Sequence, residues 1–211
     1  MTKITLLTLA LLGSGLQMSQ AISVSVSKGL NPGFNAQSSG GSTLTTFNLF
    51  LGSFDAGITA DTIKASGAGI GALIAASFNE YGTATAPANG LITGSFTKSD
   101  FTNFAATEFN GKNMFLIVTT GTTASGGQEY AILTTGATSP AETWVFPSDV
   151  TAPIGTTNAP SGVPANFSLV YGNLKDAASG VDTIQLVAIP EVSSSLLSGL
   201  AVLGLITRRK R

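Results

Sequence analysis

The chain has 211 residues, ten Lys or Arg, eleven Asp or Glu, no His and no Cys, and a formal net charge of −1. The absence of His removes the usual general base, the Ser-His-Asp arrangement and the common zinc ligand sets, and the absence of Cys excludes disulfides and thiolate sites. Residues 22–189 contain ten acidic residues, five Lys and no Arg, so this acidic part has no electrostatic footprint for nucleic acid.

The first 21 residues have the pattern of a secretory signal peptide. Lys3 supplies the positive region, and an uncharged, mostly apolar stretch runs from Ile4 to Leu16. Ser19-Gln20-Ala21 places small residues at the two positions that a signal peptidase reads. We therefore predict cleavage by signal peptidase between Ala21 and Ile22, and export of the residues that follow.

Residues 22–188 are predicted to form one mainly β extracytoplasmic domain, an antiparallel β-sandwich-like fold with one or two short helices. Ile22 to Ser27 alternates apolar and polar residues, which indicates a strand with one buried face. Lys28 to Ser42 indicates a loop, and further strands are predicted at Leu44 to Leu51 and Leu91 to Thr97. Ile70 to Phe78 fits either a short helix or a buried strand.

A helix is predicted from Ser99 to Phe109, where Ser99 can cap the first turn and Asp100 suits its positive end. Its apolar face would consist of Phe101, Phe104, Ala105 and Phe109.

Met114 to Val118 is apolar on both faces, as expected of a central strand that is covered on both sides. Glu129 to Thr134 and Thr143 to Phe146 are the next predicted strands, and the three are expected to form an antiparallel meander that buries Trp144. Phe167 to Tyr171 and Thr183 to Ala188 bring the total to about eight strands.

No catalytic, cofactor-binding or metal-binding residue is predicted, and no cofactor is expected. Gly67 to Gly71 lacks the context of a nucleotide-binding loop and indicates a turn. A calcium site built from Asp55 and Asp61 stays open as an alternative, although it lacks the alternating oxygen ligands of known calcium loops. Seven carboxylates lie mostly in loop-like sequence contexts, beside Gly, Ser or Thr: Asp55, Asp61, Glu80, Asp100, Asp149, Asp176 and Asp182. A secreted hydrolase that uses two carboxylates is therefore the least favoured alternative.

A second alternative function, suggested by the aromatic side chains, is that of a carbohydrate-binding module of an exopolysaccharide matrix. Trp144 is the leading candidate for stacking against a sugar ring, although its place in a predicted strand favours burial. The other candidates for such a platform are Tyr81, Tyr130 and Tyr171.

Residues 189–211 form a tripartite tail, in which Ile189-Pro190-Glu191 precedes an apolar stretch and Arg208-Arg209-Lys210-Arg211 follows it. The 16 uncharged residues from Val192 to Thr207 would span about 24 Å as a helix, somewhat less than a hydrocarbon core of ~30 Å. The basic side chains can reach the headgroups and are expected to stay cytoplasmic. We therefore predict a transmembrane helix at about 192–207 that anchors the body outside the cytoplasm.

The tail resembles the PEP-CTERM sorting domain of exported bacterial proteins. The resemblance consists of Pro190-Glu191, the Gly- and Leu-rich span with Gly199 and Gly204, and the basic residues 208–211. The family motif is normally Pro-Glu-Pro, and Val192 stands at the place of the second Pro. The resemblance covers about a tenth of the chain and implies recognition by an exosortase, removal of the tail and delivery to the cell surface or extracellular matrix. The alternative is a membrane anchor without processing. Together, these features predict an exported, non-enzymatic surface or matrix protein.

Overall fold

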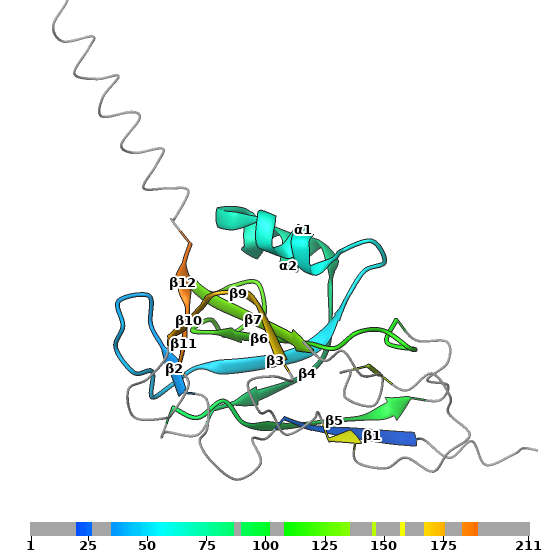
Figure 1. Cartoon of the computed structure of the whole chain (residues 1–211). Coiled ribbons are helices and arrows are strands. Elements are labelled where there is room, and N and C mark those ends of the chain that lie inside the picture. The colour runs from blue at the N-terminus through cyan, green and yellow to red at the C-terminus, as the bar shows by residue number, and fades with distance from the viewer. Residues whose placement is uncertain are drawn as a thin grey trace, which may run out of the picture.

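The structure is a computed structural model that describes residues 20–26, 35–86, 90–101, 108–135, 145–146, 157–158, 167–175 and 183–189. These residues form a mainly β fold with antiparallel sheets and few helices. Figure 1 shows the helices on one side of a central sheet and a smaller sheet on the other. The prediction of a mainly β body is confirmed at this level.

The central sheet has six strands, and every pairing within it is antiparallel. In order across the sheet, its strands are β12 (Val187–Ala188), β7 (Glu129–Thr135), β6 (Phe115–Thr119), β3 (Asn48–Phe54) and β4 (Phe78–Thr85), and β9 (Phe167–Tyr171) also pairs with β7. The two strands that share one edge of β7 divide it along its length. β12 pairs with Glu129 and Tyr130, and β9 pairs with residues 132–135.

Two small sheets cover one face of the central sheet. The first contains β5 (Gly94–Phe101), β1 (Gln20–Val26) and β8 (Thr157–Asn158), and the second contains β10 (Asn173–Lys175), β11 (Thr183–Gln185) and β2 (Asn35–Gln37). Between them and the central sheet lies what we call the strand-side core. Its members include Val24, Ala36, Leu49, Leu51, Phe96, Leu116, Val118, Leu133 and Ile184.

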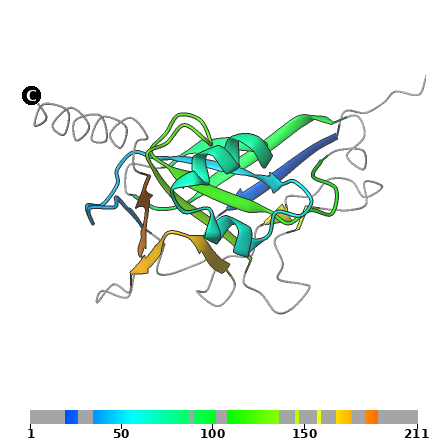
Figure 2. The same cartoon turned by 90° about the horizontal axis from the view of Figure 1, so that it is seen from above.

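Helices α1 (Ala60–Ala65) and α2 (Ile70–Ser77), with the 3-10 turn η1 (Gly67–Gly69) between them, cover the other face. The chain forms this layer between β3 and β4, and Figure 2 shows both helices lying over the strands. Thr59 caps α1 by accepting a hydrogen bond from the Thr62 backbone N–H at 3.2 Å. The layer encloses the helix-side core, whose members include Phe50, Phe54, Ile63, Ile70, Ile74, Phe115, Ile117, Tyr130, Ile132 and Tyr171.

Strand β6 is buried along its whole length, which confirms the prediction of a central strand covered on both sides. Leu116 and Val118 enter the strand-side core, whereas Phe115 and Ile117 enter the helix-side core. Successive side chains of a strand point to opposite faces, so an apolar run of this length needs a layer on each side.

The predicted helix from Ser99 to Phe109 is wrong over its first residues, because β5 extends through Ser99 and Asp100 to Phe101. Phe101 pairs with Gln20 at the end of the β1–β5 ladder. Pairing with β1 therefore overrides the local helix signal, as tertiary context often does. Residues 102–107 lie outside the described part. Phe109 is in a turn, buried in the strand-side core.

The predicted meander is correct only for its first two strands, β6 and β7. Val145 pairs with Asn113, just before β6, and the Phe146 N–H donates to the Lys112 carbonyl at 2.9 Å. The third strand cannot join β7, because β9 and β12 occupy that edge. Trp144 lies outside the described residues.

Other predicted elements differ from the structure mainly at their ends. Phe167–Tyr171 has the predicted bounds, and the segment 70–78 resolves as helix α2 followed by β4. The strand predicted at 183–188 is divided between two sheets, because Leu186 donates its N–H to the Gln37 carbonyl before the chain turns to β7. The strand predicted at 44–51 lies at 48–54, the one at 91–97 lies at 94–101, and the loop at 28–42 contains β2.

Among the described residues, no helix is long and apolar enough to cross a membrane. The predicted membrane helix at 192–207 and all of the signal peptide except Gln20 and Ala21 fall outside these residues.

Gly127 gives a test of the packing between β6 and β7. A Cβ atom at this position would lie 1.8 Å from Thr119 Oγ1, which donates to the Glu129 carbonyl at 2.8 Å. We expect Gly127→Ala to lower the free energy of unfolding by about 1–3 kcal/mol, since Thr119 is buried and its hydroxyl is held by hydrogen bonds to Glu129 and Gly121. Denaturant unfolding of the full-length protein in detergent, followed by circular dichroism, measures this change.

Gly69→Ala is the matched control, because no atom lies within 4 Å of a Cβ built at Gly69 and its φ is −82°. This variant should be neutral or more stable by ~0.4–1 kcal/mol. Equal stabilities of the two variants would contradict the close approach at Gly127.

Alkaline pH should destabilise the helix-side core. Burial raises the pKa of the Tyr130 phenol, with an opposing effect of the Gly127 N–H bond, and burial also raises the pKa of Tyr171. Above about pH 10 the tyrosines of the unfolded chain lose protons that the folded chain keeps, so the free energy of unfolding falls as pH rises. The double variant Tyr130→Phe/Tyr171→Phe should lose less stability between about pH 9 and pH 11. Thermal melts over a series of pH values measure this difference. Parallel curves of melting temperature against pH for the native protein and the double variant would contradict the prediction.

Candidate functional site at the C-terminal junction

The described body ends at Ile189, immediately before Pro190 of the predicted tail. In β12, Val187 pairs with Tyr130 and Ala188 with Glu129. The Ile189 N–H then donates to the Gln128 carbonyl at 2.7 Å, so backbone pairing continues to the last residue before Pro190. Pro190 has no N–H and cannot extend this row of donors.

The Ile189 side chain is partly buried and packs against the helix-side core. A Cβ atom built at Gly71, in the first turn of α2, would lie 3.8 Å from Ile189 Cδ1, 3.7 Å from Tyr130 Oη and 3.4 Å from the Ser125 carbonyl oxygen. Helix α2, the loop before β7 and the end of β12 therefore meet at one place. We call these residues the junction: Gly71, Ser125, Gln128, Tyr130 and Ile189.

The loop from Thr120 to Gln128 is held in shape by hydrogen bonds to its two ends. Gly121 donates its N–H to Thr119 Oγ1 at 3.2 Å, and Gly127 donates its N–H to Tyr130 Oη at 2.7 Å. A Cβ at Gly121 would lie 2.4 Å from the Gly127 nitrogen, so the two backbone segments approach closely only because both residues lack side chains. This packing positions the Gln128 carbonyl that accepts from Ile189.

The segments that meet at the junction carry no charge from residue 65 to 79 and from 119 to 128. Glu129 is adjacent in sequence, but its carboxylate accepts hydrogen bonds from the Ser39 backbone N–H and hydroxyl. Gln185 donates to the Ser39 carbonyl in the same cluster, at 2.9 Å. Neighbouring residues of a strand face opposite sides, so Glu129 points away from the helix-side core that contains Tyr130.

The predicted signal-cleavage residues Ala21 and Ile22 lie in β1. The β1–β5 register is irregular between Gln20 and Ile22 and regular from Ile22 to Val26. Cleavage between Ala21 and Ile22 would thus leave the regular part of the ladder intact. Other predicted site residues lie outside the described part of the chain: Trp144, Pro190, Glu191, Arg208, Arg209, Lys210 and Arg211.

The tyrosines of the hypothetical sugar-binding platform are buried and separated. Tyr81 belongs to the strand-side core, with its ring 5.4 Å from that of Phe109 and 5.0 Å from that of Phe146. Tyr130 and Tyr171 belong to the helix-side core, and the Tyr171 hydroxyl donates to the Gly67 carbonyl at 3.0 Å. The hypothesis that all three contribute to one exposed platform is wrong, because the central sheet separates them.

Asp55 and Glu80 accept hydrogen bonds from neighbouring side chains. Asp55 accepts from the Asn79 amide at 2.8 Å, Glu80 accepts from the Thr83 hydroxyl at 2.6 Å, and Asp61 lies in the first turn of α1. In the part of the chain that the structure describes, no three acidic residues gather to hold a metal ion. Asp149, Asp176 and Asp182 lie outside that part.

The junction was not predicted from the sequence. Gly71 and Gln128 have no distinctive local pattern, and only the pairing of β12 with β7 brings them to Ile189. Comparisons with protein-family models, curated proteins and solved structures found no match to this chain.

Proposed function

We propose that this chain is an exported, non-enzymatic cell-surface or extracellular-matrix protein whose β body is sorted through the tail at 189–211. In the precursor, a β-sandwich-like body would stand between an N-terminal signal helix and a transmembrane helix at about 192–207. The observation that carries this proposal is that the folded body continues to Ile189, with only Pro190 and Glu191 before the apolar stretch. Folded body and apolar tail thus adjoin without a linker.

The N-terminal half of the proposal is export and cleavage by signal peptidase. Met1 to Ala21 has the charge and apolar pattern that a secretory signal needs. Cleavage at this point would remove Gln20, the partner of Phe101, but the regular β1–β5 pairs from Ile22 to Val26 do not depend on the residues removed.

The C-terminal half is recognition of Pro190-Glu191 by an exosortase-like membrane peptidase. Proline disfavours helix in the residue before it and lacks a donor, so it separates the extended Ile189 from a membrane helix. Glu191 is the only charge between Ala188 and Thr207, and we assign it the recognition role that the resemblance to PEP-CTERM proteins implies. Exopolysaccharide remains a candidate partner of the body, although the buried tyrosines do not support a binding platform.

Replacing Leu9 with Arg should block export. A charge at the centre of an apolar helix costs about 2.5–3.5 kcal/mol during insertion by the translocon. Cell fractionation with immunoblotting measures the exported fraction, and Leu9→Val is the uncharged control.

Mass spectrometry of the exported protein should find Ile22 at the N-terminus. Exported protein that retains Met1 would show that residues 1–21 are not a cleaved signal.

Replacing Glu191 with Ala should leave membrane insertion intact but cause the full-length precursor to accumulate in a host that carries the sorting peptidase. The control is Glu108→Ala, which removes an exposed carboxylate in the body. Immunoblots of membrane and surface fractions give the ratio of precursor to processed protein. Unchanged processing of the Glu191 variant would show that the tail is only a membrane anchor.

Replacing residues 208–211 with Ser should instead impair retention and orientation, because these cations resist transfer across the bilayer. Protease protection of the C-terminus in intact spheroplasts measures orientation. A tail that stays inside without its four cations would contradict this assignment.

A further inference from the structure

We propose that the surface around Ile189 faces the lipid bilayer while the precursor is anchored. This membrane-facing surface consists of exposed residues of η1, α2 and the loop before β7: Ala68, Gly69, Ala72, Thr122, Thr123 and Gly126. The inference rests on the proposed membrane anchor and specifies what that anchor does to the body. The partner is a lipid surface, in contact with the headgroups.

The first reason for this orientation is the short connector between Ile189, the last described residue, and Val192, the first residue of the apolar stretch. Ile189 is fixed to the body by its hydrogen bond to Gln128 and by its contacts in the helix-side core. Three residue steps lead from Ile189 to Val192, and they span at most about 10–11 Å when fully extended. The polar layer of a bilayer is about 5–8 Å thick on each side. A fully stretched connector therefore crosses the headgroups with only a few ångström to spare.

The apolar stretch brings the body still closer. Its 16 residues span about 24 Å as a helix, against a hydrocarbon core of ~30 Å. With the basic residues 208–211 in the opposite headgroup layer, Val192 lies at or below the near edge of the hydrocarbon core unless the bilayer thins. The surface next to Ile189 must then touch the headgroup layer.

The chemistry of the surface fits this position. Residues 65–79 and 119–128 contain no charge, and the exposed groups are small apolar side chains, hydroxyls, backbone and the amide of Gln128. Such groups can approach headgroups without the cost of desolvating a charge. The body as a whole is acidic, with ten carboxylates and five Lys, whereas these two segments add no charge to a contact with the headgroups.

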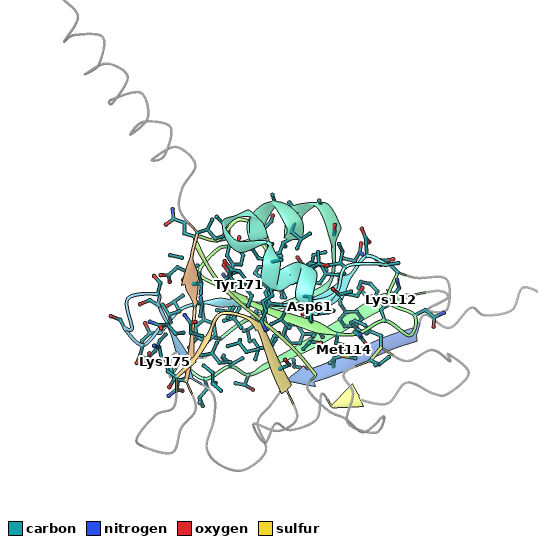
Figure 3. All side chains as sticks on the ribbon, turned by 45° about the horizontal axis from the view of Figure 1, so that its top comes forward. Asp61, Lys112, Met114, Tyr171 and Lys175 are labelled. Atoms are coloured by element: carbon teal, nitrogen blue, oxygen red, sulfur yellow. The ribbon has the colours of Figure 1, made fainter. Side chains whose placement is uncertain are left out.

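The arrangement of the elements supports the same orientation. Figure 1 shows β12 ending on the side of the central sheet that α1 and α2 cover. Gly71 and Ser125 approach Ile189 from α2 and from the loop, so both parts of the membrane-facing surface adjoin the point where the chain leaves the body. Figure 3 places Lys112 at the opposite end of the described body from β12.

Single-cysteine variants test this orientation, because the native chain has no Cys and each variant carries one label. Ala72→Cys and Thr122→Cys probe the proposed surface, and Lys112→Cys is the distant control. Each full-length protein is labelled with pyrene maleimide and reconstituted into phosphatidylcholine vesicles that contain lipids with a nitroxide headgroup. Labels at positions 72 and 122 should lose most of their fluorescence, whereas the label at position 112 should keep it.

Inserting twelve Gly and Ser residues between Ile189 and Pro190 should restore the fluorescence at positions 72 and 122. A linker of this length has a root-mean-square span of about 20 Å, which frees the body from the headgroups. Thr123→Cys and Ala68→Cys replace either probe if circular dichroism shows that a variant is misfolded.

Vesicle flotation separates the failure of this inference from the failure of the proposed function. Protein that does not float with the vesicles would overturn the membrane anchor and the inference together. Protein that floats but shows equal quenching at positions 72, 112 and 122 would overturn the inference alone. Excimer emission from position 122 without quenching would identify a second copy of the chain on this surface, and would also overturn it.

Discussion

The fold depends on burying the middle of the central sheet on both faces. β3, β6 and β7 each send alternate side chains into the strand-side core and the helix-side core. Removing either cover would expose half of these apolar side chains, at roughly 1.5–3 kcal/mol for each large one. The small sheets and the helices are thus required by the same strands, and the sequence between β3 and β4 supplies the helical cover where the sheet needs it.

The shared edge of β7 links this core to the end of the chain. β9 pairs with residues 132–135 of this edge, and β12 pairs with Glu129 and Tyr130. The chain leaves β9 through Gly172, whose φ is +115°, forms β10 and β11 in another sheet, and returns as β12. Because β12 pairs with β7, the exit point of the tail is set by the packing of the body.

Sequence patterns predicted the elements whose structure is determined locally or by complete burial. The apolar run of β6 is confirmed, since its side chains require a strand buried on both faces, and the strand at Phe167–Tyr171 is confirmed with its predicted bounds. The helix at Ser99 failed because its cap and charge pattern is equally compatible with pairing to β1, a partner distant in sequence. An apolar run such as 70–78 contains no information on which of its two structures the neighbouring sheet will accept. The junction could not be predicted from local sequence patterns, because Gly71 and Ile189 become neighbours only through β12.

The distribution of charge connects the body with its proposed place in the cell. The acidic residues are spread along the body, the four adjacent cations follow the apolar stretch, and the segments that meet at Ile189 are neutral. Apart from Glu191 in the connector itself, small neutral side chains at this place lose little hydration among the headgroups, whereas further charges would have to lose part of theirs. Once the tail is removed, nothing would hold this surface to the lipid, and the acidic body would be repelled from anionic membranes. Under the proposed function, one peptide-bond cleavage would thus convert a membrane-bound body into one that leaves the membrane.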